Sequence, residues 1–248
     1  RFEYRLRGQM GDAQWLGAGT YSGGLGTAKG LINDGYLSSS EFECDAAGRF
    51  EISISKEERP GNWLPMTEKT NQLTVRQTLL RRRSEEPASL ELDRIDAGGA
   101  PAPLDSERFL GGLGRAGLML QGVVTQFLGW TQNFQEHPHE IRELAPALSS
   151  VAQGDPNTRY FYSYWQLSED EAFVIEFTPP VCEYWNLQIG NHWLESLDYL
   201  HYDTHVNHAT AQMSPDGSVR VVVARRDPGV ANWLDTAGHA QGGLALRW

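Results

Sequence analysis

The fold class of this chain is clearest in the stretch Pro215-Asp-Gly-Ser-Val-Arg-Val-Val-Val-Ala-Arg-Arg-Asp-Pro-Gly-Val-Ala-Asn-Trp-Leu234. Its valine run at residues 218–225 predicts a strand, because β-branched side chains fit a pleated, half-buried surface. Residues 214–217 before the run have the composition of a hairpin turn, and Asp-Pro-Gly after it has that of a second turn. A strand bounded by two turns indicates a protein built from short strands.

Segments of the same kind occur on both sides of this stretch. Alternating apolar and polar residues, with turns rich in Gly and Asp about every ten residues, are typical of an antiparallel sandwich or barrel. The Gly-rich segment 17–35 interrupts the pattern and is expected to be a surface loop, and 168–171 is expected to be a further hairpin turn. The predicted strands are 2–7, 14–17, 41–44, 49–55, 73–79, 160–167, 172–177, 184–189, 204–213 and 218–225.

The periodicity becomes helical after the linker at residues 96–103, which is rich in Gly, Ala and Pro. Asp105 offers an N-cap, and apolar residues then recur at helical spacing, so residues 107–130 are predicted to be mainly helical. These apolar residues lie on more than one face, and the helix is therefore expected to pack on two sides. A second helix is predicted at residues 139–151.

Together these patterns predict a mainly β chain, an antiparallel β-sandwich with a helical insert near residues 104–153. Residues 1–103 would supply the first set of sandwich strands and residues 154–248 the second set, within one compact domain. Two tryptophan segments, Arg59-Pro-Gly-Asn-Trp-Leu64 and Arg226-Asp-Pro-Gly-Val-Ala-Asn-Trp-Leu234, each follow a Pro-Gly turn. They are expected to place equivalent tryptophans in two halves of one sheet system.

Composition excludes several functional classes. The formal net charge of -11 argues against nucleic acid as a partner, since phosphate binding needs a basic face. No apolar run approaches the ~20 residues that span a bilayer, so no membrane partner is predicted and the cytoplasm is the expected location. The start at Arg1 rather than Met leaves a missing N-terminal segment open. Cys44 and Cys182 lack metal-ligand spacing and are expected to be free and buried, and a disulfide between them across the sandwich is left open.

The C-terminal block also resembles a known family. A Tyr-Trp-Asn segment at residue 184, the Pro-Asp-Gly-Ser turn, the valine run, Asp-Pro-Gly and Asn-Trp-Leu resemble the bacterial family called domain of unknown function 1214. The resemblance covers about residues 155–240 and is weaker over 45–80. It implies a jelly-roll-like β-sandwich and carries no activity, so function has to be argued from the site.

Histidines and carboxylates are dense between residues 184 and 239, which raises the question of a metal. His201, His205 and His208 stand at i, i+4 and i+7, and a helix would place their imidazoles on one face. The same segment fits a strand better, and His205 and His208 would then point to opposite faces. No metal site is therefore predicted, and the sequence names no cofactor.

Acid-base chemistry on a small-molecule ligand is the leading functional hypothesis. An imidazole held against a carboxylate in a pocket could serve a hydrolase or lyase, and the pocket is expected near residues 192–208 and 227–239. The candidate catalytic residues are His192, Glu195, His205 and His239. Whether the chain is an enzyme is left open, as is assembly into a homo-oligomer.

The alternative is a non-catalytic β-sandwich module that binds a carbohydrate or another ring-bearing ligand. Tryptophan rings that follow loops offer flat amphipathic surfaces for such ligands. Convergent imidazole and carboxylate groups would favour the enzyme, and an open aromatic strip without them would favour the module. The candidate binding residues are Trp63, Trp193, Arg226, Trp233 and Asp235.

Overall fold

The valine run forms strand β13 (Val219–Ala224) in the computed structural model, which describes residues 2–27, 29–95, 103–145 and 158–248. Val219, Val221 and Val223 are fully buried, whereas Arg220 is exposed, because successive side chains of a strand point to opposite faces. β13 lies between β10 (Ala172–Phe177) and β14 (Trp233–Asp235) in a three-stranded sheet.

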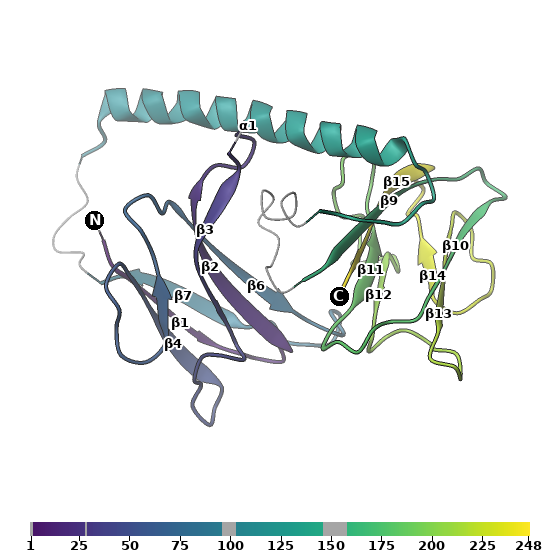
Figure 1. Cartoon of the computed structure of the whole chain (residues 1–248), viewed down its shortest axis with the longest axis horizontal. Helices are drawn as coiled ribbons and strands as arrows, with labels where there is room; N and C mark the ends of the chain where they lie inside the picture. The colour runs from purple at the N-terminus through teal and green to yellow at the C-terminus, as the bar shows by residue number, and fades with distance from the viewer. Residues whose placement is uncertain (1, 28, 96–102, 146–157) are drawn as a thin grey trace. The chain divides into compact units, whose positions relative to one another are not determined.

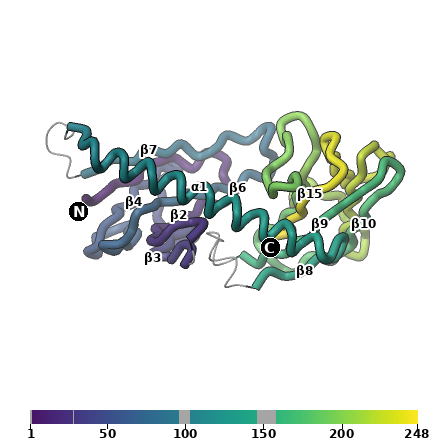
Figure 2. The backbone as a smooth tube through the Cα atoms, turned by 90° about the horizontal axis from the view of Figure 1, so that it is seen from above, coloured from purple at the N-terminus to yellow at the C-terminus, as the bar shows by residue number. Residues whose placement is uncertain are grey.

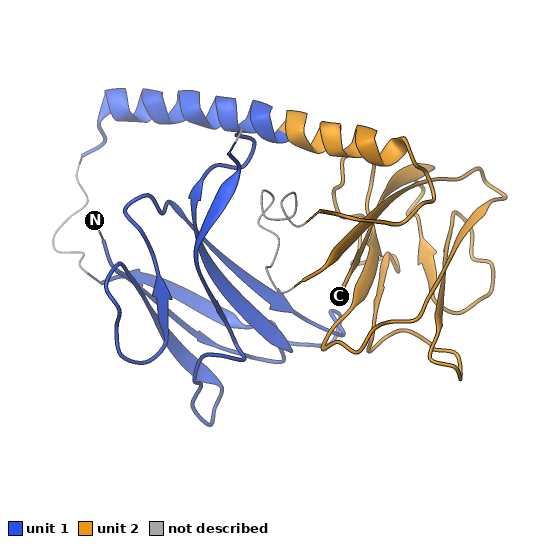
Figure 3. Ribbon diagram, viewed as in Figure 1, with its two compact units in different colours: residues 1–123, 150–153 blue, residues 124–149, 154–248 orange. Residues whose placement is uncertain are grey.

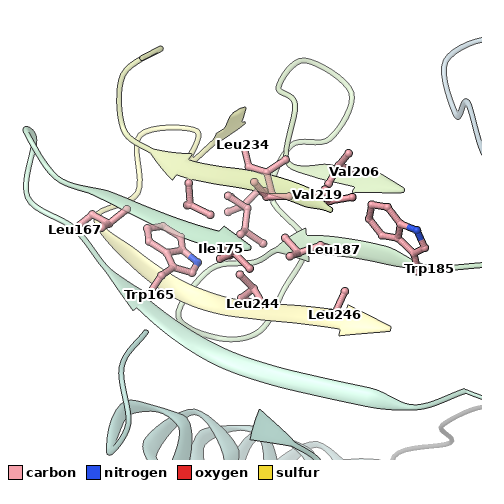
Figure 4. Close-up of a cluster of buried hydrophobic side chains, with 14 residues drawn as sticks. Trp165, Leu167, Ile175, Trp185, Leu187, Val206, Val219, Leu234, Leu244 and Leu246 are labelled. Atoms are coloured by element: carbon pink, nitrogen blue, oxygen red, sulfur yellow. The ribbon is translucent and has the colours of Figure 1, made fainter. Parts of the chain in front are cut away.

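A five-stranded sheet packs against this one. Its strands run in the order β12 (His205–Asn207), β11 (Asn186–Ile189), β15 (Gln241–Arg247), β9 (Tyr160–Gln166) and β8 (Arg142–Glu143). Figure 1 labels the first four of these strands. The inward side chains of the two sheets form one hydrophobic core, drawn in Figure 4. That core includes Trp165, Leu187, Leu244, Leu246, Ile175, Val219 and Leu234.

The N-terminal region has a second pair of sheets with its own core. One sheet has the order β5 (Trp63–Pro65), β4 (Arg49–Ser55), β1 (Tyr4–Gln9) and β7 (Ser89–Arg94). The other has the order β3 (Leu31–Ser38), β2 (Trp15–Gly23) and β6 (Gln72–Thr78). Leu6, Leu16, Ile52 and Leu64 are at most 2% exposed and belong to this core.

The helix α1 (Ser106–Gln135) confirms the helical prediction for residues 107–130. Figure 2 shows it as one continuous helix. The contacts divide the chain into two compact units, coloured in Figure 3, and the division falls within α1 between Val123 and Val124. The expectation of packing on two sides is wrong for the first half of α1, where Leu110, Leu113 and Leu118 are exposed. The division into residues 1–103, 104–153 and 154–248 stays a prediction.

The two units share one topological plan. The orders β5-β4-β1 and β3-β2-β6 of the first unit correspond to β14-β13-β10 and β12-β11-β15 of the second, so β1 to β6 match β10 to β15 in chain order. Strands β7, β8 and β9 extend sheet edges beyond this plan. The pairs β4–β5 and β13–β14 are parallel, and the other strand pairs are antiparallel. The jelly-roll-like connectivity expected from the resemblance stays a prediction.

Equivalent asparagines close the two parallel pairs. Each accepts a backbone N–H through Oδ1 and donates two hydrogen bonds through Nδ2 to backbone carbonyls at 2.8–3.1 Å. Before each asparagine, Gly61 and Gly229 have φ of 79° and 71°, the left-handed region that favours glycine. Asn62 binds Glu43 and Glu51 in this way, and Asn232 binds Gln212 and Arg220.

The tryptophans that follow these asparagines occupy equivalent positions, as expected. Trp63 pairs with Ser53 and donates its indole N–H to Ser55 Oγ at 3.1 Å. Trp233 pairs with Val222 and donates its indole N–H to the Ala224 carbonyl at 3.0 Å. They lie in separate sheets of the two units, so the expectation of one sheet system is wrong.

Several local predictions need correction. Residues 17–35 are not a surface loop, since β2 and β3 pair along most of this segment and Leu16, Ala18 and Tyr21 are buried. Residues 41–44 form no strand, because Glu41 turns the chain by accepting the Ser38 N–H. Residues 168–171 join strands of two different sheets rather than a hairpin.

The predictions for residues 139–151 and 204–213 also fail in part. Residues 139–145 hold the short strand β8 and no helix, and His139 has a positive φ of 65°; residues 146–151 lie outside the described part. The strand after residue 204 ends at Asn207, whose side chain accepts the N–H groups of Ala209 and Thr210 and so starts a turn.

We call Asn62 and Asn232, each with its three hydrogen bonds to the backbone, the asparagine corners. They should contribute substantially to the stability of their units. We expect Asn62→Ala and Asn232→Ala each to lower the free energy of unfolding by about 1–3 kcal/mol, because backbone groups lose their hydrogen-bond partners. Urea denaturation measures both losses, with Val230→Ala in the exposed neighbouring turn as control. A change in either asparagine variant no larger than that of the control would contradict the assignment.

Candidate functional site

The outward side of the five-stranded sheet carries polar and aromatic side chains in two rows. In the first row the register places Asn207, Asn186, Arg247 and Tyr160 side by side. In the second row it places His205, Gln188, Ala245 and Tyr162 side by side. Tyr184 precedes β11 and is hydrogen-bonded to Asn186. We use the term polar face for seven of these residues: Tyr160, Tyr162, Tyr184, Asn186, Gln188, His205 and Arg247.

One carboxylate is described beside this side of the sheet: Glu140 forms an ion pair with Arg142, the outward residue of the edge strand β8. The outward positions of the five strands hold no Asp or Glu, although the chain has 32 acidic and 21 basic residues. The seven residues of the polar face are all half-buried. The local electrostatics of the polar face are therefore opposite in sign to the net charge of the chain.

The polar groups of the face contact one another across the strands. Arg247 Nη1 donates to Gln188 Oε1 at 3.1 Å, and its guanidinium carbon lies 5.9 Å from the centroid of the Tyr160 ring. Asn186 Nδ2 donates to the Tyr184 hydroxyl at 2.7 Å. These contacts join an arginine of β15, two amides of β11 and the phenol that precedes β11.

Two buried polar atoms near Tyr184 lack hydrogen-bond partners within the described part of the chain. They are Asn186 Oδ1 and His208 Nδ1. The His208 ring meets the Tyr184 ring edge-on, with centroids 5.6 Å apart. A buried polar atom without a partner costs about 1–3 kcal/mol, and an ordered water or a ligand can satisfy it.

Burial raises the pKa of Tyr184 above its ordinary value. The Asn186 hydrogen bond and the positive charge of Arg247 act in the opposite direction, and burial outweighs them. Burial likewise raises the pKa of Tyr164, against a hydrogen bond from the Gln135 side chain. Both phenols are therefore neutral donors at physiological pH.

His192, one of the predicted catalytic residues, contacts two aromatic side chains and the helix α1. Its Nδ1 lies 2.7 Å from the hydroxyl of Tyr164, which is 1% exposed, and its carbonyl accepts the Thr131 hydroxyl of α1 at 3.0 Å. The Trp193 ring, 54% exposed, packs edge-on against the imidazole. This arrangement ties the loop after β11 to the end of α1.

Glu195 belongs to the same loop and is engaged locally. Its carboxylate accepts Asn191 Nδ2 at 2.7 Å, and Asn191 Oδ1 accepts the N–H groups of Trp193 and Glu195. Leu194 between them has a positive φ of 61°. Glu195 therefore closes a tight turn rather than orienting His192.

The other predicted site residues lie in different settings. His205 belongs to the polar face, whereas His239 is exposed in the turn after β14. Asp235 Oδ1 caps that turn through the Ala237 N–H, and Arg226 forms an exposed ion pair with Glu169. Trp233 and Trp63 belong to the two asparagine corners, in different units.

No group of three or more His, Cys, Asp or Glu side chains suited to a metal occurs among the described residues. His201 instead pairs with Asp198 at 2.8 Å on an exposed turn, and this hydrogen bond lowers the pKa of Asp198. Cys44 and Cys182 are free and exposed, so the expectation that they are buried is wrong.

Comparison with known proteins places this unit in a family. A family model described as a protein of unknown function, DUF1214, matches residues 164–248. The crystal structure of an uncharacterized protein from Burkholderia cenocepacia is 43% identical, with a TM-score of 0.95 over 100% of this chain and 69% of that chain. The chain belongs to the DUF1214 family.

A more distant structure shares the fold of this DUF1214 protein. The VPA0106 protein from Vibrio parahaemolyticus is 11% identical, with a TM-score of 0.55 over 98% of this chain and 80% of that chain. A search of curated proteins gives no match. None of the helical segments in the described ranges has the length and hydropathy of a membrane span.

Of the polar face, the sequence proposed His205 alone as a site residue, because the outward side chains of predicted strands were not compared across strands, and Arg247 was missed because β15 was not predicted. The alternation in Gln241-Gly-Gly-Leu-Ala-Leu-Arg247 was the available signal: Leu244 and Leu246 point inward, and Ala245 and Arg247 outward. The same alternation in Tyr160-Phe-Tyr-Ser-Tyr-Trp165 separates outward tyrosines from the inward Trp165.

The raised pKa of Tyr184 gives a pH prediction. A phenol with a higher pKa in the folded state stabilises it fully below the ordinary tyrosine pKa of about 10, and this contribution is lost as pH rises through the folded-state pKa. We expect the free energy of unfolding to fall more steeply above pH ~10 in the parent protein than in Tyr184→Phe. Tyrosinate absorbance follows the titration, and an unchanged late-titrating fraction in Tyr184→Phe would contradict the assignment.

Proposed function

We propose that the C-terminal unit of this DUF1214 protein binds a small polar molecule that carries a ring, and that the polar face is its binding site. The observation that carries the proposal is the concentration of half-buried amides, phenols and one guanidinium on a sheet surface whose outward strand positions hold no Asp or Glu. Small-molecule sites combine flat apolar surface with a few fixed polar groups in this way.

The side chains of the polar face offer complementary contacts to such a ligand. Gln188 and Asn186 each provide an amide with donor and acceptor atoms. Tyr160 and Tyr162 provide rings suited to stacking against a sugar or an aromatic ring. The Phe134 ring of α1 stacks on Tyr162 with centroids 5.1 Å apart and an angle of 7°, which fixes the orientation of Tyr162.

The orphaned Asn186 oxygen supports the same proposal. A ligand hydroxyl could donate to Asn186 Oδ1 after a small rotation of the amide, and the binding energy would then include relief of an unmet hydrogen bond. Sugar hydroxyls are donors of this kind, so carbohydrates are one class of ring ligand within the proposal.

Binding is favoured over hydrolase or lyase chemistry by the composition of the face. His205 is the predicted catalytic residue that belongs to it, and its outward neighbours across β11 and β15 are Gln188 and Ala245. A general acid and base on this surface would have to be an imidazole and a phenol rather than a carboxylate pair. The catalytic set His192, Glu195, His205 and His239 stays a prediction.

Ligand binding can be tested on the full chain by saturation-transfer NMR with a panel of monosaccharides, cyclic polyols and ring carboxylates. We expect at least one chemical class to bind the parent protein and to lose at least tenfold in affinity in Gln188→Leu and in Asn186→Leu. The matched control is Gln72→Leu, because Gln72 lies on β6, the strand of the first unit that corresponds to β15.

The variants also separate this proposal from its alternatives. Equal binding by the parent protein and both polar-face variants would overturn the assignment of the site. A ligand whose affinity depends on Trp193 or His239 instead would favour the loops predicted from sequence. Thermal unfolding of each variant checks that a lost signal reflects the site and not the fold.

A further inference from the structure

Arg247 has an unusual environment for an arginine of this chain. Exposed arginines of the second unit pair with carboxylates: Arg159 with Glu143, Arg220 with Glu176, and Arg226 with Glu169. Arg247 is half-buried, yet no carboxylate lies within ion-pair distance of it in the described ranges, and its side-chain hydrogen bond goes to the neutral Gln188. Most of its five N–H donors are therefore available.

The environment of Arg247 also differs from that of the corresponding arginine in the first unit. The equivalent tryptophans align Arg5 of β1 with Val174 of β10 through the strand registers. Gly17 and Asn186 lie twelve residues after these two positions (17 − 5 and 186 − 174) and are therefore equivalent. Gly17 pairs with Arg76 and Asn186 with Arg247, so Arg76 is the counterpart of Arg247. Arg76 Nη1 contacts the Tyr21 hydroxyl at 3.2 Å. Tyr21 lies four residues after Gly17, and the residue four after Asn186 is Gly190, which has no side chain to fill that role.

The groups around Arg247 are donors or neutral acceptors. Tyr184 accepts from Asn186 Nδ2 and so retains its own hydroxyl proton for donation, and it lies close enough to Arg247 to feel its charge. A cation held partly out of water without a counter-ion is costly, and an arriving anion would remove that cost. A guanidinium also matches the planar geometry of a carboxylate through two parallel hydrogen bonds.

We propose that the ligand of the polar face is an anion, a ring-bearing carboxylate whose charged group binds the Arg247 guanidinium and whose ring lies toward Tyr160. This inference rests on the proposed function and names the ligand class of the same site. One guanidinium balances one negative charge, which favours a carboxylate over a phosphate dianion. Asn186 and Gln188 then form hydrogen bonds with the remaining hydroxyl or carbonyl groups of the ligand.

A matched set of probes tests the charged group by itself. Glucuronate, glucose and glucose 6-phosphate share one ring and differ in the group at the sixth carbon, and benzoate and benzamide form a second pair with an aromatic ring. Isothermal titration of the full chain measures their affinities. We expect at least one carboxylate to bind about tenfold more tightly than its neutral partner, as a charged hydrogen bond predicts.

Variants then assign the preference to Arg247. Arg247→Gln should reduce the preference for the carboxylate to about twofold or less, and Arg247→Lys should retain part of it because the positive charge remains. Arg220→Gln is the matched control, since Arg220 is an exposed arginine of β13 that pairs with Glu176. Its preference should equal that of the parent protein.

The outcomes distinguish the anion proposal from the binding proposal. Equal affinity for carboxylate and neutral partner, or a preference that survives in Arg247→Gln, overturns the anion proposal while binding to the polar face stands. Stronger binding of glucose 6-phosphate than glucuronate overturns the choice of carboxylate. Absence of binding by every probe overturns both proposals.

One further measurement needs no variant. The affinity of the parent protein for the carboxylate should fall as sodium chloride rises from about 50 to 500 mM, whereas the affinity for the neutral partner should not, because salt screens charge pairs. Equal salt dependence for both probes would count against an ionic contact. This keeps the proposal testable if the Arg247 variants fold poorly.

Discussion

The structure of the C-terminal unit depends on the period of two in its strands. Burial of Leu187, Leu244 and Leu246 fixes the register of β11 and β15, and the same register sends Asn186, Gln188 and Arg247 to the other side. A shift of one residue would place a guanidinium and two amides in the core, at a cost of several kcal/mol. The packing of the core therefore also determines the composition of the polar face.

The two units share a topological plan and differ in the side chains on the outward side of one sheet. The parts that repeat are structural: the parallel strand pairs, the asparagine corners and the indole N–H bonds. The parts that differ lie on the outward side, where Gly17 and Gly19 of β2 correspond to Asn186 and Gln188 of β11. Amides in place of glycines give the second unit polar side chains that the first unit lacks at these positions.

The sequence predicted those elements in which one local signal dominates. Strands β9, β10 and β13 and helix α1 were found because valine, aromatic residues or a helical repeat fill each of them. Strand β15 was missed because two glycines and an alanine lower its β propensity, although its inward leucines complete the core. The turn after Asn207 depends on a hydrogen bond to its side chain, and the alternation of apolar and polar residues does not predict such a bond.

The candidate site was harder to predict than the fold. A high density of histidine and tryptophan directed attention to the loops, where Glu195 and Asp235 prove to close their own turns. The polar face instead joins residues from Tyr160 to Arg247, which become neighbours only through strand register. The spacing of residues along the chain does not show which of them are neighbours across strands, because that depends on the strand register.

The central claim is that the polar face is the place where a ligand binds, and chemical-shift mapping tests it most directly. Nitrogen-15-labelled protein would be titrated with the tightest ligand of the panel. The account predicts the largest shifts at the side-chain N–H groups of Asn186, Gln188 and Arg247. Shifts concentrated instead at Trp193 and His239, or in the N-terminal unit, would contradict it.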